Sequence, residues 1–115
     1  MQFYHGHNVS HFFQFEKHIT SRYGFPCIFM TDNKELALQY GKFIYTKEFH
    51  NIYATSIDFK GKVSYSLEFR NLIHQLFKEG KQSVLIKNVY DRKDESLPLL
   101  KSDILVIFNI DLCIP

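Results

Sequence analysis

Long apolar runs, clusters of basic residues and paired cysteines are all missing from this sequence of 115 residues. No apolar segment approaches bilayer length, and the amino terminus lacks the basic and apolar segments of a signal peptide. The formal net charge of +2 is spread along the chain, with no run of four or more basic residues that would favour a nucleic acid backbone. The sequence therefore predicts a soluble, cytoplasmic protein with no membrane partner.

The two cysteines have neither the spacing of a zinc site nor the density of a disulfide scaffold. Cys27 and Cys113 each lie in an apolar stretch of sequence. We expect both to be buried thiols in a reducing compartment.

Apolar residues make up 45% of the chain and aromatic residues 17%, which is enough for one hydrophobic core. No linker, internal repeat or low-complexity segment divides the sequence. Residues 1–115 are therefore expected to form a single domain.

The hydrophobic pattern alternates between strand and helix signals. The strongest helix signal covers 67–79, where apolar residues recur at helical spacing before Gly80. A capping pair, Asp32 and Glu35, predicts a shorter helix that ends at Gly41. A helix is also expected from Ser10 to Tyr23, strands at 2–5, 27–30, 43–45, 52–59, 83–87 and 104–108, and an exposed loop at 88–102.

This mixed order predicts an α+β domain, a class that by itself indicates no function. Three motifs are more informative. They are Phe3-Tyr-His-Gly, the segment Ile28-Phe-Met-Thr-Asp before a helix that ends Ala-x-x-Tyr at residue 40, and the pair 84–91 and 102–108. In this order they resemble the ADP-ribosyltransferases of the diphtheria-toxin and poly(ADP-ribose) polymerase type, and especially small members from phages and polyvalent proteins.

The resemblance implies a fold of two packed, mainly antiparallel sheets around an NAD cleft, with flanking helices. It implies NAD as substrate, transfer of ADP-ribose to a macromolecular acceptor and release of nicotinamide. The acceptor is expected to be a protein, with nucleic acid as the alternative. The protein is expected to come from a phage or a plasmid, or to be a toxin-like effector.

The resemblance also assigns roles to individual residues. His5 would bond a ribose hydroxyl, the backbone of Gly6 would pair with the carboxamide, and Tyr40 would stack on the nicotinamide ring. Phe29 would line the facing wall. A histidine in an aromatic strand or a tyrosine on a short helix can equally be a packing residue. The remaining positions expected to contact NAD are Tyr4, Thr31 and Ile104.

The third catalytic position departs from the family pattern. Many members have Glu or Gln directly before the last strand, where this sequence has Ile104. Asp103 is one residue earlier, and neighbours on a strand point to opposite faces, so its carboxylate would reach the ribose only if a bulge shifts the register. Asp103 is the candidate for the third catalytic residue, and a solvated aspartate is the alternative. Without such a bulge the three positions are His, Tyr and Ile, a pattern that resembles the mono-ADP-ribosyl branch of the polymerase superfamily and equally resembles inactive members.

The segment from Val89 to Lys101 lies where the family keeps its acceptor-recognition loop, although a solvated surface connection explains its charges equally well. Three alternative functions remain open. The domain could bind NAD, ADP-ribose or a protein partner without catalysis, or it could be related to RNA 2′-phosphotransferases, whose basic cluster is missing here. A metal site is the third, built from His5, His7, His11 and His18.

Overall fold

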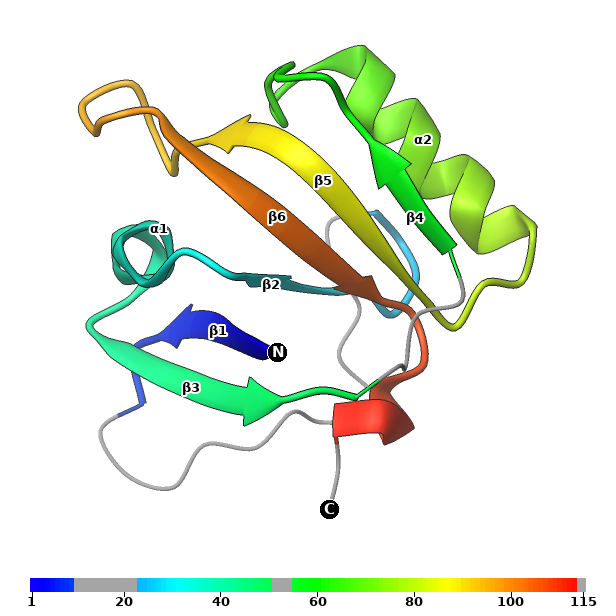
Figure 1. Ribbon diagram of the computed structural model, residues 1–115, viewed down its shortest axis with the longest axis horizontal. Coiled ribbons are helices and arrows are strands. Elements are labelled where there is room, and N and C mark those ends of the chain that lie inside the picture. Colours follow the sequence, from blue (N-terminus) through cyan, green and yellow to red (C-terminus); the bar gives the residue numbers. More distant parts are fainter. Residues whose placement is uncertain (10–22, 51–54, 114–115) are drawn as a thin grey trace.

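The computed structural model describes residues 1–9, 23–50 and 55–113. It has an α+β fold, as expected, with one mixed six-stranded sheet in the order β3-β1-β2-β6-β5-β4 (Figure 1). The helix expected from Ser10 lies outside the described residues, except for its last residue. The elements are β1 (Gln2–His7), β2 (Ile28–Thr31), α1 (Lys34–Tyr40), β3 (Phe43–Glu48), β4 (Thr55–Asp58), α2 (Leu67–Lys78), β5 (Ser83–Asp91), β6 (Leu100–Ile107) and the 3₁₀ turn η1 (Ile110–Cys113).

The expectation of two separate sheets was wrong for the described chain. Neighbouring strands are antiparallel apart from β4 and β5, which run parallel. The join between β1 and β2 is a single residue pair, Tyr4 with Thr31, whereas β1 and β3 pair along their whole length. Strand pairing between the β3–β1 end and the other four strands is therefore limited to one residue pair, and packing of Phe3 in the core adds to it.

The two faces of the sheet carry different apolar clusters. Along β6, Ile104 and Val106 pack in the cluster that contains α2, and Leu105 and Ile107 pack in the cluster that contains η1. This alternation is the period of a strand buried on both sides. We call the side that packs against α2 the helix face, and the other side the opposite face.

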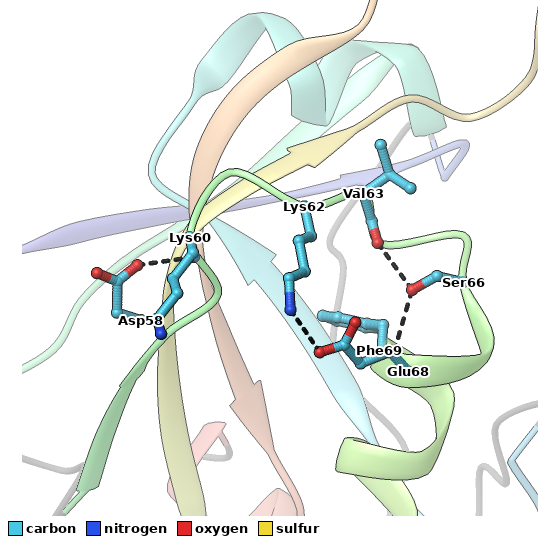
Figure 2. Close-up of polar contacts among 7 residues, drawn as sticks. All are labelled: Asp58, Lys60, Lys62, Val63, Ser66, Glu68 and Phe69. Atoms are coloured by element: carbon cyan, nitrogen blue, oxygen red, sulfur yellow. Dashed lines mark hydrogen bonds and ion pairs between the residues drawn. The ribbon is translucent and has the colours of Figure 1, made fainter.

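Helix α2 confirms the clearest sequence prediction. Phe69, Ile73 and Leu76 are buried at helical spacing in the helix-face cluster. Ser66 caps the helix by accepting a bond from the N–H of Phe69 at 3.1 Å, and its hydroxyl donates to the carbonyl of Val63 at 3.0 Å (Figure 2).

The loop that leads into α2 is fixed by two further contacts that Figure 2 draws. The carboxylate of Asp58 accepts from the backbone N–H of Lys60 at 2.8 Å, where the chain turns with a positive φ of 58°. Farther along, the ammonium of Lys62 binds Glu68 at 2.7 Å. The chain is therefore held in place between β4 and α2.

Helix α1 begins one residue later than its sequence pattern predicts. Asn33, rather than Asp32, is the N-cap, and its side-chain oxygen accepts from the N–H groups of Glu35 and Leu36. Asp32 instead accepts a bond from the backbone N–H of Asp103 at 2.9 Å. The side chain expected to cap α1 thus ties β2 to β6.

The hairpin of β5 and β6 is longer than expected. The segment 88–102 was expected to be an exposed loop, but β5 continues to Asp91 and β6 begins at Leu100. A bulge interrupts the pairing between Ile86 and Val89, so residues 87 and 88 lie opposite Asp103 alone. The bulge breaks the alternation that would have marked a strand.

Both cysteines are buried, as expected, with 6% of Cys27 and 2% of Cys113 exposed. Burial raises the pKa of the Cys113 thiol to about 11. No helix in the described ranges has the length and apolar character needed to cross a membrane.

Candidate functional site

Five residues expected to contact NAD lie on the helix face of the sheet. Directly paired residues share a face, and Tyr4 pairs with Thr31, which itself pairs with Ile104. Gly6 and Phe29 follow by the two-residue alternation of β1 and β2. The fold therefore brings together positions that are far apart in the sequence, namely Tyr4, Gly6, Phe29, Thr31 and Ile104.

Part of this group belongs to the hydrophobic core. Ile104 is 5% exposed within the α2 cluster, and Phe29 packs against that cluster with its ring 6.3 Å from the ring of Phe69. Thr31 is buried, and its hydroxyl bonds to the hydroxyl of Ser102 on β6. Core packing is sufficient to explain Phe29 and Ile104.

Gly6 is explained by the approach of α1. A Cβ at this position would lie 1.9 Å from the carbonyl oxygen of Ala37, so only glycine lets the helix backbone contact β1. Gly41 makes a matching contact, because its Cβ would lie 2.3 Å from the backbone of His7. The space that was expected to admit a ligand beside Gly6 is occupied by α1.

His5 belongs to the opposite face. It alternates with Gly6, and Phe3, two residues before it, lies in the cluster that contains η1. Its Nδ1 lies 2.9 Å from the carbonyl oxygen of Phe29, which fixes the tautomer with the proton on Nδ1. Burial lowers the pKa of His5, the bond to Phe29 opposes that shift, and nearby His7 adds to it. The imidazole is therefore a neutral donor to β2.

Asp103 supports the bulge. A bulge was the condition for Asp103 to reach the ribose, and one is present, but it is in β5. The carboxylate of Asp103 accepts from the backbone N–H of Asn88 at 3.0 Å, and Asn88 has a positive φ of 58°. The side-chain amide of Asn88 donates to Asp58 at 2.9 Å. In this arrangement the carboxylate of Asp103 satisfies a backbone donor of the bulge.

Tyr40 lies where α1 meets the end of β5. Its hydroxyl donates to a carboxylate oxygen of Asp91 at 2.7 Å, and the other oxygen of Asp91 accepts from the hydroxyl of Ser64. Asp91 lies on the helix face, two residues beyond buried Val89. We call Tyr40, Asp91 and Ser64 the Tyr40–Asp91 cluster.

The surroundings of this cluster are ordered by neighbouring side chains. The amide of Gln39 donates to the carbonyl of Pro98 at 2.9 Å and accepts from the N–H of Lys93 at 3.0 Å, so α1 holds the hairpin loop at two points. Next to Asp91 and Ser64 in the sequence, Arg92 and Tyr65 pair, with the guanidinium of Arg92 5.5 Å from the ring centre of Tyr65. Tyr40 is 40% exposed and Tyr65 is 53% exposed, so both rings offer a surface to solvent.

The side chains of the helix face thus change from apolar to polar along the hairpin of β5 and β6. Near α2 it is apolar, whereas toward the loop it carries the bonded hydroxyls of Thr31 and Ser102 and then the Tyr40–Asp91 cluster. An exposed aromatic ring beside a carboxylate and a hydroxyl can stack on a planar ligand and bind its hydroxyl groups. We regard this polar end as the candidate site.

Sequence reasoning named Tyr40 as a candidate but did not name its bonded neighbours, Asp91 and Ser64. Asp91 begins a run of charged residues whose composition resembles a solvated loop, and its strand pattern is hidden by the bulge. Two features of the sequence could have pointed to Asp91. It ends the segment 84–91 of the third motif, and it follows the apolar Val89 by two residues, which is the spacing of one strand face.

The histidine metal site gains no support from the described residues, where no group of three or more His, Cys, Asp or Glu could hold a metal ion. His11 and His18, two of its four expected members, lie outside the described ranges.

Comparisons of the chain with protein-family models, curated proteins and solved structures find no match.

Proposed function

We propose that the protein is an NAD-dependent mono-ADP-ribosyltransferase that modifies a macromolecular acceptor, a protein by preference, and releases nicotinamide. The observation that carries the proposal is Tyr40. The tyrosine that the motif resemblance assigns to nicotinamide stacking is exposed over 40% of its surface, and its hydroxyl is fixed by Asp91. It also lies on the face that carries Tyr4, Gly6, Phe29, Thr31 and Ile104.

Stacking on a fixed ring suits the chemistry. Transfer breaks the bond between ribose and nicotinamide through a transition state with positive charge on the ribose, so the enzyme must hold the leaving group in one orientation. The bond between Tyr40 and Asp91 restricts rotation of the phenol, and the ring face can receive the planar nicotinamide.

His5 has a different role in this proposal from the one that the resemblance implies. Its Nδ1–H donates to the carbonyl of Phe29, which joins β1 to β2 next to their single residue pair. His5 then supports the site by fixing β1 under α1. Contact with the ribose would require its imidazole to reach from the opposite face.

The second candidate is a catalytically degenerate domain that binds NAD, ADP-ribose or a protein partner. Two observations favour it. Ile104 is 5% exposed within the core, and the carboxylate of Asp103 is bonded to the backbone N–H of Asn88. Neither position expected to supply the third catalytic group therefore presents a carboxylate beside Tyr40.

Incubation of the protein with radiolabelled NAD and a cell lysate separates the candidates. The transferase should label a macromolecule, and protease or nuclease treatment would identify the acceptor class. A degenerate domain should give no label but should be stabilised by NAD in a saturable way. Absence of both label and NAD binding would refute the proposal.

A further inference from the structure

The geometry points to Asp91 as the catalytic carboxylate that binds a ribose hydroxyl of NAD, with Ser64 orienting it. This inference rests on the proposed function. It also goes beyond the motif resemblance, which assigns the carboxylate to the start of the last strand and not to the end of the preceding one.

The first argument is the position of the carboxylate. Asp91 is 2.7 Å from the phenol oxygen of Tyr40, so any planar group stacked on that ring lies beside Asp91. In NAD the ribose is bonded directly to the nicotinamide ring. A nicotinamide stacked on Tyr40 with its ribose directed toward the phenol oxygen has its ribose hydroxyls beside Asp91.

The second argument is that the carboxylate of Asp91 can accept further hydrogen bonds. A carboxylate has about four lone-pair sites. The hydroxyl of Tyr40 reaches one oxygen and the hydroxyl of Ser64 reaches the other. Two such donors fix the plane of the carboxylate and leave it able to accept a bond from a ligand hydroxyl.

The third argument is that the other nearby acidic groups hold the fold together. Asp103 accepts from Asn88 in the bulge, and Asp32 accepts from the backbone of Asp103. Asp91 bonds only side-chain hydroxyls among its described partners, and both come from segments that border the candidate site.

The step balances without a further reagent. The bond between ribose C1 and the nicotinamide nitrogen breaks, and its electron pair neutralises the positive nitrogen of the leaving nicotinamide. The acceptor forms the new bond to C1 and loses its proton to water. The negative charge of Asp91 stabilises the positive ribose while its oxygen holds the hydroxyl.

The test compares Asp91→Asn with wild type in two assays, nicotinamide release from NAD in the presence of acceptor lysate and direct NAD binding. Asparagine keeps the shape and loses the charge. We expect release to fall about a hundredfold and the dissociation constant for NAD to change less than about threefold, because the charge acts mainly in the transition state. Asp111→Asn is the matched control, an exposed aspartate of η1, whose residues pack in the cluster of the opposite face, and it should release nicotinamide at the wild-type rate.

Asp91→Glu provides the second variant if the asparagine variant does not fold. It keeps the charge and moves it by one methylene, and we expect release about tenfold below wild type with NAD affinity retained. An active wild type with either variant equally active overturns the role of Asp91 and leaves the transferase proposal standing. A wild type that binds NAD without releasing nicotinamide also overturns this role, whereas a wild type that does not bind NAD refutes the proposed function itself.

Discussion

Gly6 and Gly41 allow α1 to lie directly on the backbone of β1. The positions that a Cβ would take are 1.9 Å from the carbonyl oxygen of Ala37 and 2.3 Å from the backbone of His7. Both neighbours are main-chain atoms, which cannot rotate away as a side chain can. The placement of Tyr40, one turn after Ala37, depends on this contact.

Gly6→Ala should therefore destabilise the protein by about 3 kcal/mol, because the helix must move off the strand. The free energy of unfolding in urea measures the effect. Gly24→Ala is the control, since Gly24 has a φ of +86° but open space around its Cβ position. That change should cost about 1 kcal/mol from backbone strain alone, and equal losses for the two variants would contradict the steric explanation.

His5 should make the free energy of unfolding depend on pH. Its pKa in the folded protein lies below the ordinary value of 6.5 because burial disfavours the charged imidazole. The unfolded chain then binds a proton first as the pH falls, so the stabilisation is present above 6.5 and is lost as the pH falls from 6.5 through the lower folded value.

His5→Gln removes this titration and keeps an N–H donor for the carbonyl of Phe29. Urea unfolding from about pH 7.5 to about pH 5 should show a smaller loss of stability in the variant than in wild type. His50→Gln, at an exposed histidine, should follow wild type. A wild-type acid loss that survives His5→Gln would assign the effect to other groups.

At the scale of elements, the bulge in β5 depends on a side chain from β6. Asp103 accepts from the N–H of Asn88, the residue with positive φ that β6 cannot pair with in the ordinary register. The bulge displaces the end of β5, and so it helps to set where Asp91 meets Tyr40.

Asp103→Ala should destabilise the protein by about 2 kcal/mol, because it leaves a partly buried N–H without an acceptor. NAD affinity of the folded fraction should change little, since Asp103 acts on the bulge and not on the ligand. Thermal unfolding and NAD titration measure the two effects. Glu95→Ala, at an exposed acidic residue of the hairpin loop, should affect neither, and a large loss of NAD affinity with unchanged stability would restore Asp103 as a site residue.

Elements with a regular pattern could be predicted from the sequence, and those set by tertiary contacts could not. Helix α2 has apolar residues at helical spacing and was predicted to within a residue. The ends of β5 and β6 were missed because the bulge breaks their alternation. Asp32 has the sequence pattern of a cap, but its side chain bonds β6, and Asn33 caps α1 instead.

The candidate site was predictable only in part for the same reason. Each motif lies within one segment of the sequence, and the motifs were enough to name Tyr40, Tyr4 and Ile104 as candidates. Asp91 and Ser64 join them through contacts across 51 and 27 residues of sequence, which no local pattern encodes. His5 was expected beside Tyr40, but strand alternation places it with Phe3 on the opposite face.

At the scale of the whole molecule, the candidate site lies where separate parts of the sheet meet. In Figure 1, α1 lies near the hairpin of β5 and β6, and α2 follows β4 at the other end of the helix face. The β3–β1 end joins the remaining strands through one residue pair, the His5 bond, the packing of α1 and the burial of Phe3 in the opposite-face cluster with residues of β2, β5 and β6. A ligand that contacts both α1 and β5 would therefore add a link between two parts of the fold that Gln39 and Tyr40 already join.

NAD at a hundredfold its dissociation constant should add about 2.7 kcal/mol to the stability of wild type, measured as a rise in the thermal midpoint. Hydrogen exchange should slow at the end of α1 and at residues 91–93, where Gln39 and Tyr40 hold the hairpin, and should be unchanged along the outer strand β3. Tyr40→Ala should abolish both effects while the protein stays folded, whereas Leu38→Ala, which alters a side chain of the same helix that is 50% exposed, should keep them. Stabilisation of the Tyr40→Ala variant equal to that of wild type would place any NAD site elsewhere, because the stacking surface and its bond to Asp91 would both be gone.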